Sequence, residues 1–330
     1  MAEVWGRVVA LQANYCSVVL DPPAADPALG ELQAPPDPLP QSPPQPQRLL
    51  CTRRTRLDHA GLQVCVGDRV RLEGMDIAAG RAAVAALAPR ANLLQRPLVA
   101  NVSRVVVVAS LADPPLDPSQ LSRFLLSAEA CGAAVDLVLS KADLVPPAQR
   151  LLWIESLAGW GYPARAVSSR TGEGLDALAS SLTAAGGGIL VLCGPSGAGK
   201  SSLLNALCAD LALRVAPVSG RLRRGRHTTR HVELFPLAPG TLLADTPGFN
   251  RPELPAEAAA LAWLFPELRA KLASGTCRFR NCRHLGDPGC VAGIDWPRFP
   301  HYQQAIAELE QAAAACRSSG GGLSRRGRAD

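Results

Sequence analysis

Long apolar runs are missing from this sequence of 330 residues. A membrane-spanning helix needs about 18 or more consecutive apolar residues, and no stretch reaches that length. The beginning of the chain carries Glu3 and lacks the basic-then-apolar layout of a secretory signal peptide. We therefore expect a cytoplasmic protein without a membrane partner.

A dominant charge is also missing. The 34 basic and 28 acidic residues give a formal net charge of +6, which permits a polyanionic partner without demonstrating one. The sequence shows no heptad repeat that would join two chains, so we expect a monomer.

Ten cysteines are present, but nothing indicates secretion, so disulfide bonds are not expected. Three of them cluster toward the C-terminus and are considered below. The other seven are scattered and are interpreted as small buried hydrophobic residues: Cys16, Cys51, Cys65, Cys131, Cys193, Cys208 and Cys316.

Short β-branched segments occupy residues 5–9, 17–20 and 64–72, with glycines between them. Short strands with regular turn residues favour a small barrel or sandwich, which we assign to residues 1–90. Residues 21–47 contain ten prolines and few side chains that would be buried, so we expect a disordered insert there.

Residues 91–254 have the alternating strand and helix pattern of a doubly wound α/β domain. Helical spacing of apolar positions appears at 119–131. Apolar runs typical of parallel strands buried on both faces lie at 105–109 and 135–140, and further strands are expected at 164–167, 189–193 and 241–245. In residues 255–330 we expect two helical segments, 256–273 and 302–316, around a cysteine-rich knot, followed by a basic tail.

The strongest motif is a match to the phosphate-binding pattern G-x-x-x-x-G-K-[ST] between a strand and a helix. The glycines let backbone N–H groups surround phosphates, and the helix N-terminus adds positive potential. Lys200 can reach the β- and γ-phosphates, and the Ser201 hydroxyl can ligate Mg²⁺. The predicted binding residues are Gly194, Pro195, Ser196, Gly197, Ala198, Gly199, Lys200, Ser201 and Ser202.

The sequence D-T-P-G at 245–248 follows the last strand of this pattern. Asp245 can hold Mg²⁺ through a water, and the Gly248 N–H can meet the γ-phosphate. Because this motif follows a phosphate-binding loop, we interpret it as part of the nucleotide site rather than as an ordinary turn.

The sequence S-K-A-D at 140–143 resembles the guanine-binding motif N-K-x-D. Asp143 can accept two hydrogen bonds from guanine that adenine cannot offer, and Lys141 can lie across the base. Ser140 replaces the usual Asn, which removes an amide and is expected to reduce affinity while leaving discrimination to Asp143. Ser168 and Ser169 suit a backbone contact to the guanine carbonyl.

The order of these motifs is permuted, because the base motifs at 140–143 and 168–169 precede the phosphate motifs at 194–201 and 245–248. With a barrel before it and a cysteine-rich tail after it, the chain resembles the RsgA (YjeQ/EngC) family of circularly permuted small-ribosomal-subunit biogenesis GTPases. The resemblance implies an N-terminal OB-fold β-barrel, a central permuted α/β P-loop GTPase domain and a C-terminal helical zinc-binding domain.

The resemblance also assigns a switch segment around Thr228 and Thr229, either of which can ligate Mg²⁺ and contact the γ-phosphate. Phe249 stands where Ras-like proteins carry a water-orienting Gln, and Phe cannot orient water. The resemblance implies that His227 takes over this task. The predicted catalytic residues are therefore His227, Lys200, Thr228 and Thr229.

Cys277, Cys282, His284 and Cys290 supply three thiolates and one imidazole within 14 residues. This set suits one tetrahedral Zn²⁺, and the spacing matches the tail domain of the family. Because protein side chains fill all four positions, we expect a structural ion.

The barrel resembles an OB-fold, a module that often binds oligonucleotides. Arg53, Arg54, Arg56, Arg69 and Arg71 form a basic strip suited to RNA phosphates. Aromatic residues make up only 4% of the sequence, so we expect shape and phosphate recognition rather than base stacking to dominate.

These observations predict a GTPase that is stimulated by the small (30S) ribosomal subunit, binds its rRNA, and acts late in the maturation of that subunit. Hydrolysis of GTP to GDP and phosphate would drive its release. One alternative is an RNA-binding scaffold that uses GTP or GDP only as a structural ligand. Another is an ATP-dependent kinase or transporter subunit, which Asp143 disfavours.

Overall fold

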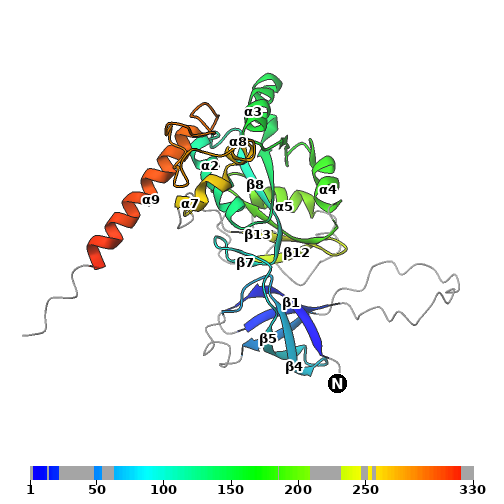
Figure 1. Ribbon diagram of the computed structural model, residues 1–330. Coiled ribbons are helices and arrows are strands. Elements are labelled where there is room, and N and C mark those ends of the chain that lie inside the picture. The colour runs from blue at the N-terminus through cyan, green and yellow to red at the C-terminus, as the bar shows by residue number, and fades with distance from the viewer. Residues whose placement is uncertain are drawn as a thin grey trace, which may run out of the picture.

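The computed structural model describes most of the chain and shows three regions, a barrel, a central sheet domain and a C-terminal helical region (Figure 1). The described residues are 3–12, 15–21, 48–53, 63–184, 186–208, 232–246, 252–254 and 258–320, the last five without their side chains. The Pro-rich insert expected at residues 21–47 therefore lies almost entirely outside the described residues.

The first region is a closed five-stranded barrel. The strands pair in the order β1-β2-β3-β5-β4, and β4 pairs back with β1, which is the arrangement of an OB-fold. Alternate side chains such as Val8, Val18 and Leu49 fill its interior. The strands are β1 Val4–Leu11, β2 Tyr15–Leu20, β3 Arg48–Arg53, β4 Arg69–Asp76 and β5 Arg81–Leu87.

The strand expected at residues 64–72 begins only at Arg69. The carboxylate of Asp68 accepts a hydrogen bond from the Cys65 N–H at 2.7 Å, and Gly67 has a φ of 91°, so the preceding residues form a turn. The same carboxylate, fully buried, accepts two hydrogen bonds from Arg90 and fixes the point where the chain leaves the barrel.

The central sheet runs in the order β10-β9-β8-β11-β13-β12, parallel except for β12. β8 lies at the topological switch point, because the chain adds β9 and β10 on one side of it and β11 on the other. The strands are β8 Val102–Ser110, β9 Ala134–Ser140, β10 Ala164–Ala166, β11 Gly188–Cys193, β12 Glu233–Ala238 and β13 Thr241–Asp245. A short hairpin, β6 Leu93–Leu94 and β7 Val99–Ala100, precedes them.

Helices cover both faces of this sheet. Val105 and Val107 of β8 pack with α2 and α3, whereas Val106 and Val108 face α4 and α5. The helices are α2 Pro118–Ala130, α3 Pro147–Gly159, α4 Leu175–Thr183 and α5 Lys200–Leu207, with a 3-10 turn η1 at Ala142–Leu144. The predicted doubly wound pattern is confirmed, and its parallel strands all end at one edge.

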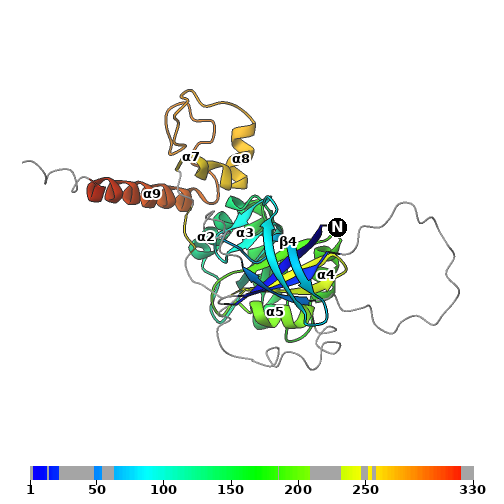
Figure 2. The same ribbon diagram turned by 90° about the horizontal axis from the view of Figure 1, so that it is seen from below.

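The C-terminal region is helical, as predicted, but the expected helix at 256–273 is interrupted. Phe265 is extended and Pro266 follows it, because proline disfavours a helical conformation in the residue before it. The elements are α7 Ala258–Leu261, η2 Ala262–Leu264, α8 Pro266–Ala273 and α9 Phe299–Gly320. α9 projects away from the sheet in both views (Figures 1 and 2).

A buried arginine fixes this region to the central sheet domain. Arg298 has no exposed surface and forms a bidentate ion pair with Glu267. Its Nε and Nη2 atoms donate to the two carboxylate oxygens at 2.6 and 2.7 Å. Its guanidinium lies 5.3 Å from the ring centroids of Trp160 and Tyr162, which belong to the central domain, and 4.5 Å from that of Phe265. The aromatic cage compensates part of the cost of burying the charge.

Candidate nucleotide and metal sites

The phosphate-binding loop joins β11 to α5, as the motif predicts. Gly194 has a φ of 147°, and a Cβ there would lie 2.1 Å from the carbonyl oxygen of Val108. Gly197 and Gly199 also have positive φ angles, of 80° and 85°. Only glycine can therefore occupy position 194, where the backbone of the loop lies in direct contact with the neighbouring strand β8.

Lys200 is the first residue of α5 and is held inside the loop. Its ammonium donates to the carbonyls of Gly194 and Pro195, each at 2.8 Å. Burial lowers the pKa of Lys200, while the neighbouring Cys193 and Asp245 act in the opposite direction. The lysine predicted to contact phosphates is therefore a mostly buried cation beside an acidic residue.

Asp245 and Thr246 stand at the carboxyl end of β13, next to the phosphate-binding loop. β13 pairs with β11 in parallel, with Ala244 opposite Val191. The buried Thr246 hydroxyl donates to the carbonyl of Leu192, which ties the two strand ends together. Ser201 lies exposed in the first turn of α5, so the two predicted Mg²⁺ ligands lie on adjacent elements.

Ser140 links the predicted base motif to the phosphate-binding loop. It is buried at the end of β9, and its hydroxyl donates to the carbonyl of Ala198 at 2.6 Å. The sequence indicated only that Ser140 lacks the amide of the usual Asn. The structure shows that the hydroxyl makes a direct connection between residues 58 positions apart.

Asp143 and Ser168 come from the ends of neighbouring strands and meet. The Ser168 hydroxyl donates to Asp143 at 2.6 Å, and Arg170 donates to the other carboxylate oxygen at 2.8 Å. The hydrogen bond from Ser168, followed by that from Arg170, lowers the pKa of Asp143. The carboxylate thus remains ionised at neutral pH, as acceptance of two N–H groups from a guanine requires.

Two contacts in this area were not predicted. The contact of Arg170 with Asp143 belongs to no sequence motif. The only sequence signal for it is that Arg170 is a basic residue directly after Ser168 and Ser169. Lys141 has a left-handed φ of 58°, and its ammonium donates to the carbonyl of Asp113 in the loop before α2. This loop also approaches the phosphate site, because a Cβ on Gly197 would lie 3.3 Å from Pro114.

Several predicted residues lie outside the described part of the chain. These are Gly248, Phe249 and the switch residues His227, Thr228 and Thr229, as well as Arg54 and Arg56 of the barrel. Within the described barrel, Arg69 pairs with Asp21 at 2.8 Å, and Arg71 lies near Glu3 and Glu73. The basic strip is therefore partly neutralised.

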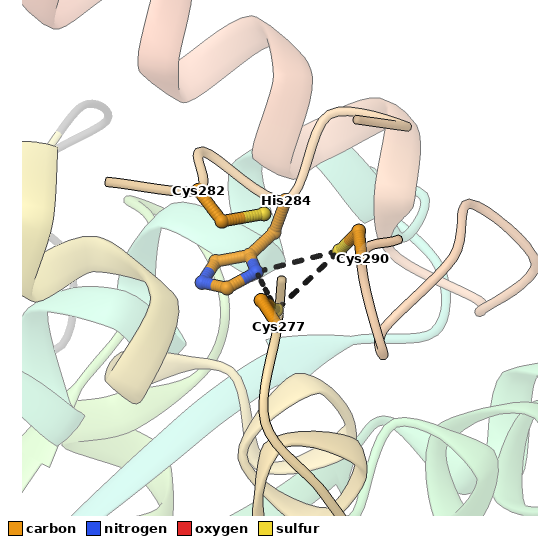
Figure 3. Close-up of side chains that lie close together, drawn as sticks. All are labelled: Cys277, Cys282, His284 and Cys290. Carbon is orange, nitrogen blue, oxygen red and sulfur yellow. Dashed lines mark hydrogen bonds between the residues drawn. The ribbon is translucent and has the colours of Figure 1, made fainter. Parts of the chain in front are cut away.

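Cys277, Cys282, His284 and Cys290 converge in the loop between α8 and α9 (Figure 3). All four ligand atoms lie within 4.8 Å of one another. The Nδ1 atom of His284 lies 3.6 Å from the Cys277 sulfur and 3.5 Å from the Cys290 sulfur, and these two sulfurs are 3.9 Å apart.

The three distances among His284, Cys277 and Cys290 fit a tetrahedral ion. Bonds of about 2.3 Å to sulfur and about 2.0–2.1 Å to nitrogen place the ligand atoms ~3.5–3.8 Å apart. Burial also lowers the pKa of His284, which favours the neutral imidazole that a metal ion needs. The cluster can therefore bind a metal ion.

Within the described residues, no helix combines the length and the apolar character that crossing a membrane requires.

Comparisons with known proteins agree with this architecture. The family model RsgA GTPase matches residues 87–255. The small ribosomal subunit biogenesis GTPase RsgA of Parasynechococcus marenigrum is 52% identical over 96% of this chain and 100% of its own length. The protein of the same name from Synechococcus sp. CC9605 is 54% identical over 96% of this chain and 97% of its own.

Two solved structures have the same fold. YjeQ from Thermotoga maritima has a TM-score of 0.70 at 26% identity, covering 94% of this chain and 99% of its own. YloQ, described as a circularly permuted GTPase, has a TM-score of 0.68 at 24% identity, covering 94% and 96%, and supports the fold alone. The chain belongs to the RsgA family of circularly permuted GTPases and is a GTP hydrolase.

Proposed function

We propose that this chain is a GTPase stimulated by the small ribosomal subunit, and that it acts late in the maturation of that subunit. Its relatives are named for the biogenesis of this subunit. The observation that supports the nucleotide site of this proposal is the 2.6 Å hydrogen bond between Ser140 and Ala198, because it ties the proposed base motif to the proposed phosphate motif. The family's hydrolase activity is at odds with the scaffold alternative.

The proposed nucleotide site lies at the edge where the parallel strands end. Asp143 and Lys141 would bind guanine, with Ser140 holding the motif to the loop and Ser168 and Ser169 closing the base site. Backbone N–H groups of residues 194–202 and the ammonium of Lys200 would bind the phosphates, with the N–H of Gly248 meeting the γ-phosphate. Such a site suits GTP because Asp143 is ionised and accepts hydrogen bonds.

Mg²⁺ would be held by Ser201 directly and by Asp245 through a water, where it neutralises charge on the β- and γ-phosphates. The parallel pairing of β11 with β13 supports this assignment, because it brings Asp245, at the end of β13, close to the loop that leads from β11 into α5, where Ser201 lies. Thr228 or Thr229 would complete the ligand set when the switch segment docks.

His227 is proposed to orient the attacking water. Phe249 cannot do so, and the segment from 221 to 230 carries five arginines that would respond to RNA phosphates. Docking on the subunit would order this segment, which predicts slow hydrolysis by the free protein and faster hydrolysis on the subunit.

The Cys₃His cluster is proposed to hold one structural Zn²⁺, because its four side chains leave no position for a substrate. We propose three functional units, residues 1–90, 91–254 and 255–330, in which the first and the last hold rRNA. The protein would act in the cytoplasm as a monomer, and hydrolysis to GDP and phosphate would drive its release.

The proposal is tested by measuring GTP hydrolysis with and without purified small subunits, for wild type, His227→Ala and His231→Ala. We expect strong stimulation of wild type and of His231→Ala, the neighbouring control, and little stimulation of His227→Ala. Equal stimulation of both variants would remove His227 from the mechanism. Unchanged hydrolysis of wild type on adding subunits would refute the proposed function.

A further inference from the structure

The loop between Cys277 and Cys282 holds an aromatic side chain out from the surface. Phe279 is 48% exposed and is one of three exposed large aromatic side chains in the part of the chain that the structure describes. The Cys282 N–H donates to the carbonyl of Phe279 at 3.2 Å, and the Arg278 N–H donates to Gly289 at 3.1 Å. The ring therefore stands on a tight turn whose two ends belong to the metal-binding cluster.

Basic residues flank this ring in the sequence. Residues 277–284 contain three arginines and no acidic residue. The guanidinium of Arg278 lies 5.5 Å from the centroid of the Phe279 ring. Arg280 is exposed, and within the described residues neither it nor Arg278 has an ion-pair partner, whereas Arg283 pairs with Glu310 of α9.

The loop is also anchored to α9 from behind. The Tyr302 hydroxyl donates to the carbonyl of Arg283 at 2.8 Å, and the ion pair between Arg283 and Glu310 lies beside it. Two contacts to one helix leave Phe279, Arg278 and Arg280 as the outward-facing part of a preorganised loop. Because these groups are already held in place, binding a ligand would cost little conformational entropy.

We infer that Phe279, Arg278 and Arg280 form a binding site for an unpaired RNA nucleotide. The base stacks on the Phe279 ring, and the two guanidinium groups contact the flanking phosphates. An exposed π-face beside cations that lack acidic partners is the combination that single-stranded nucleic acid requires. The inference rests on the proposed function, because the RNA would be that of the small subunit.

The site is tested by the affinity of the full-length, zinc-loaded chain for purified small subunits across a series of salt concentrations. Phe279→Ala is expected to weaken binding about tenfold or more without changing the salt dependence. Arg280→Ala should lower the slope of log affinity against log salt by about one. Phe279→Trp should retain binding, and Trp263→Ala, which removes another exposed ring, should have no effect.

Chemical modification of the subunit RNA identifies the partner. Wild type should protect an unpaired nucleotide, and Phe279→Ala should lose that protection while keeping its zinc and its circular dichroism spectrum. Weaker binding without any change at an unpaired nucleotide would indicate a protein partner and would overturn the inference. If wild type binds and is stimulated but Phe279→Ala binds equally well, the inference alone fails. If wild type does not bind subunits, the proposed function fails as well.

Discussion

Replacing Ser140 by alanine tests the connection between the base motif and the phosphate-binding loop. The Ser140 hydroxyl is buried and donates to the carbonyl of Ala198, which has no exposed surface. The substitution removes the donor and leaves a buried carbonyl without this hydrogen bond, at a cost of about 1–3 kcal/mol. Because Ala198 lies within the loop, part of that cost should appear as weaker nucleotide binding. A loss of about 1.4 kcal/mol corresponds to a tenfold higher Kd.

The assay is a titration of GDP by calorimetry, combined with urea unfolding. Ser122→Ala is the matched control, because Ser122 is also buried but its hydroxyl has no hydrogen-bond partner among the described residues. We expect Ser122→Ala to leave the Kd unchanged and to keep or raise stability, and Ser140→Ala to lower stability and raise the Kd. If the two variants behave alike, the hydroxyl does not support the loop and the reasoning is refuted.

Gly194→Ala should abolish nucleotide binding, because its Cβ would lie 2.1 Å from a backbone oxygen, whereas Gly159→Ala, whose Cβ would meet only Pro297 at 3.9 Å, should still bind; equal GDP affinities would contradict this. Arg298→Ala should lower the free energy of unfolding by about 3–5 kcal/mol, because it leaves the carboxylate of Glu267 buried without its partner. A loss below about 1 kcal/mol in urea unfolding would show that the pair contributes little. A chelator should remove one zinc per chain and lower the melting temperature, and Cys277→Ser should do the same; metal analysis that finds no zinc in the wild-type protein would contradict this.

The fold class could be predicted because its signals are local. A glycine-rich loop between an apolar run and a helix needs no long-range information, and neither does a set of four metal ligands within 14 residues. The interruption at Pro266 was also present in the sequence, since proline disfavours helix in the preceding residue, but the prediction passed over it. The strands β3 and β5 were not predicted individually, because they consist largely of leucine, alanine and arginine and contain few β-branched residues.

The contacts that complete the site depend on residues far apart in the sequence. Ser140 reaches Ala198 across 58 positions, and Arg170 reaches Asp143 across 27. No local pattern specifies such a pair, because each depends on which strand ends become neighbours in the folded sheet. Arg298 is a further case, since an arginine in sequence is usually expected at the surface, and only the folded structure supplies its aromatic cage.

We propose that the nucleotide state controls attachment of the protein to the small subunit. This is tested by the affinity of the full-length protein for purified small subunits, with a non-hydrolysable GTP analogue and with GDP. We expect tight binding with the analogue and release with GDP. Equal affinity in the two states would refute the proposed control.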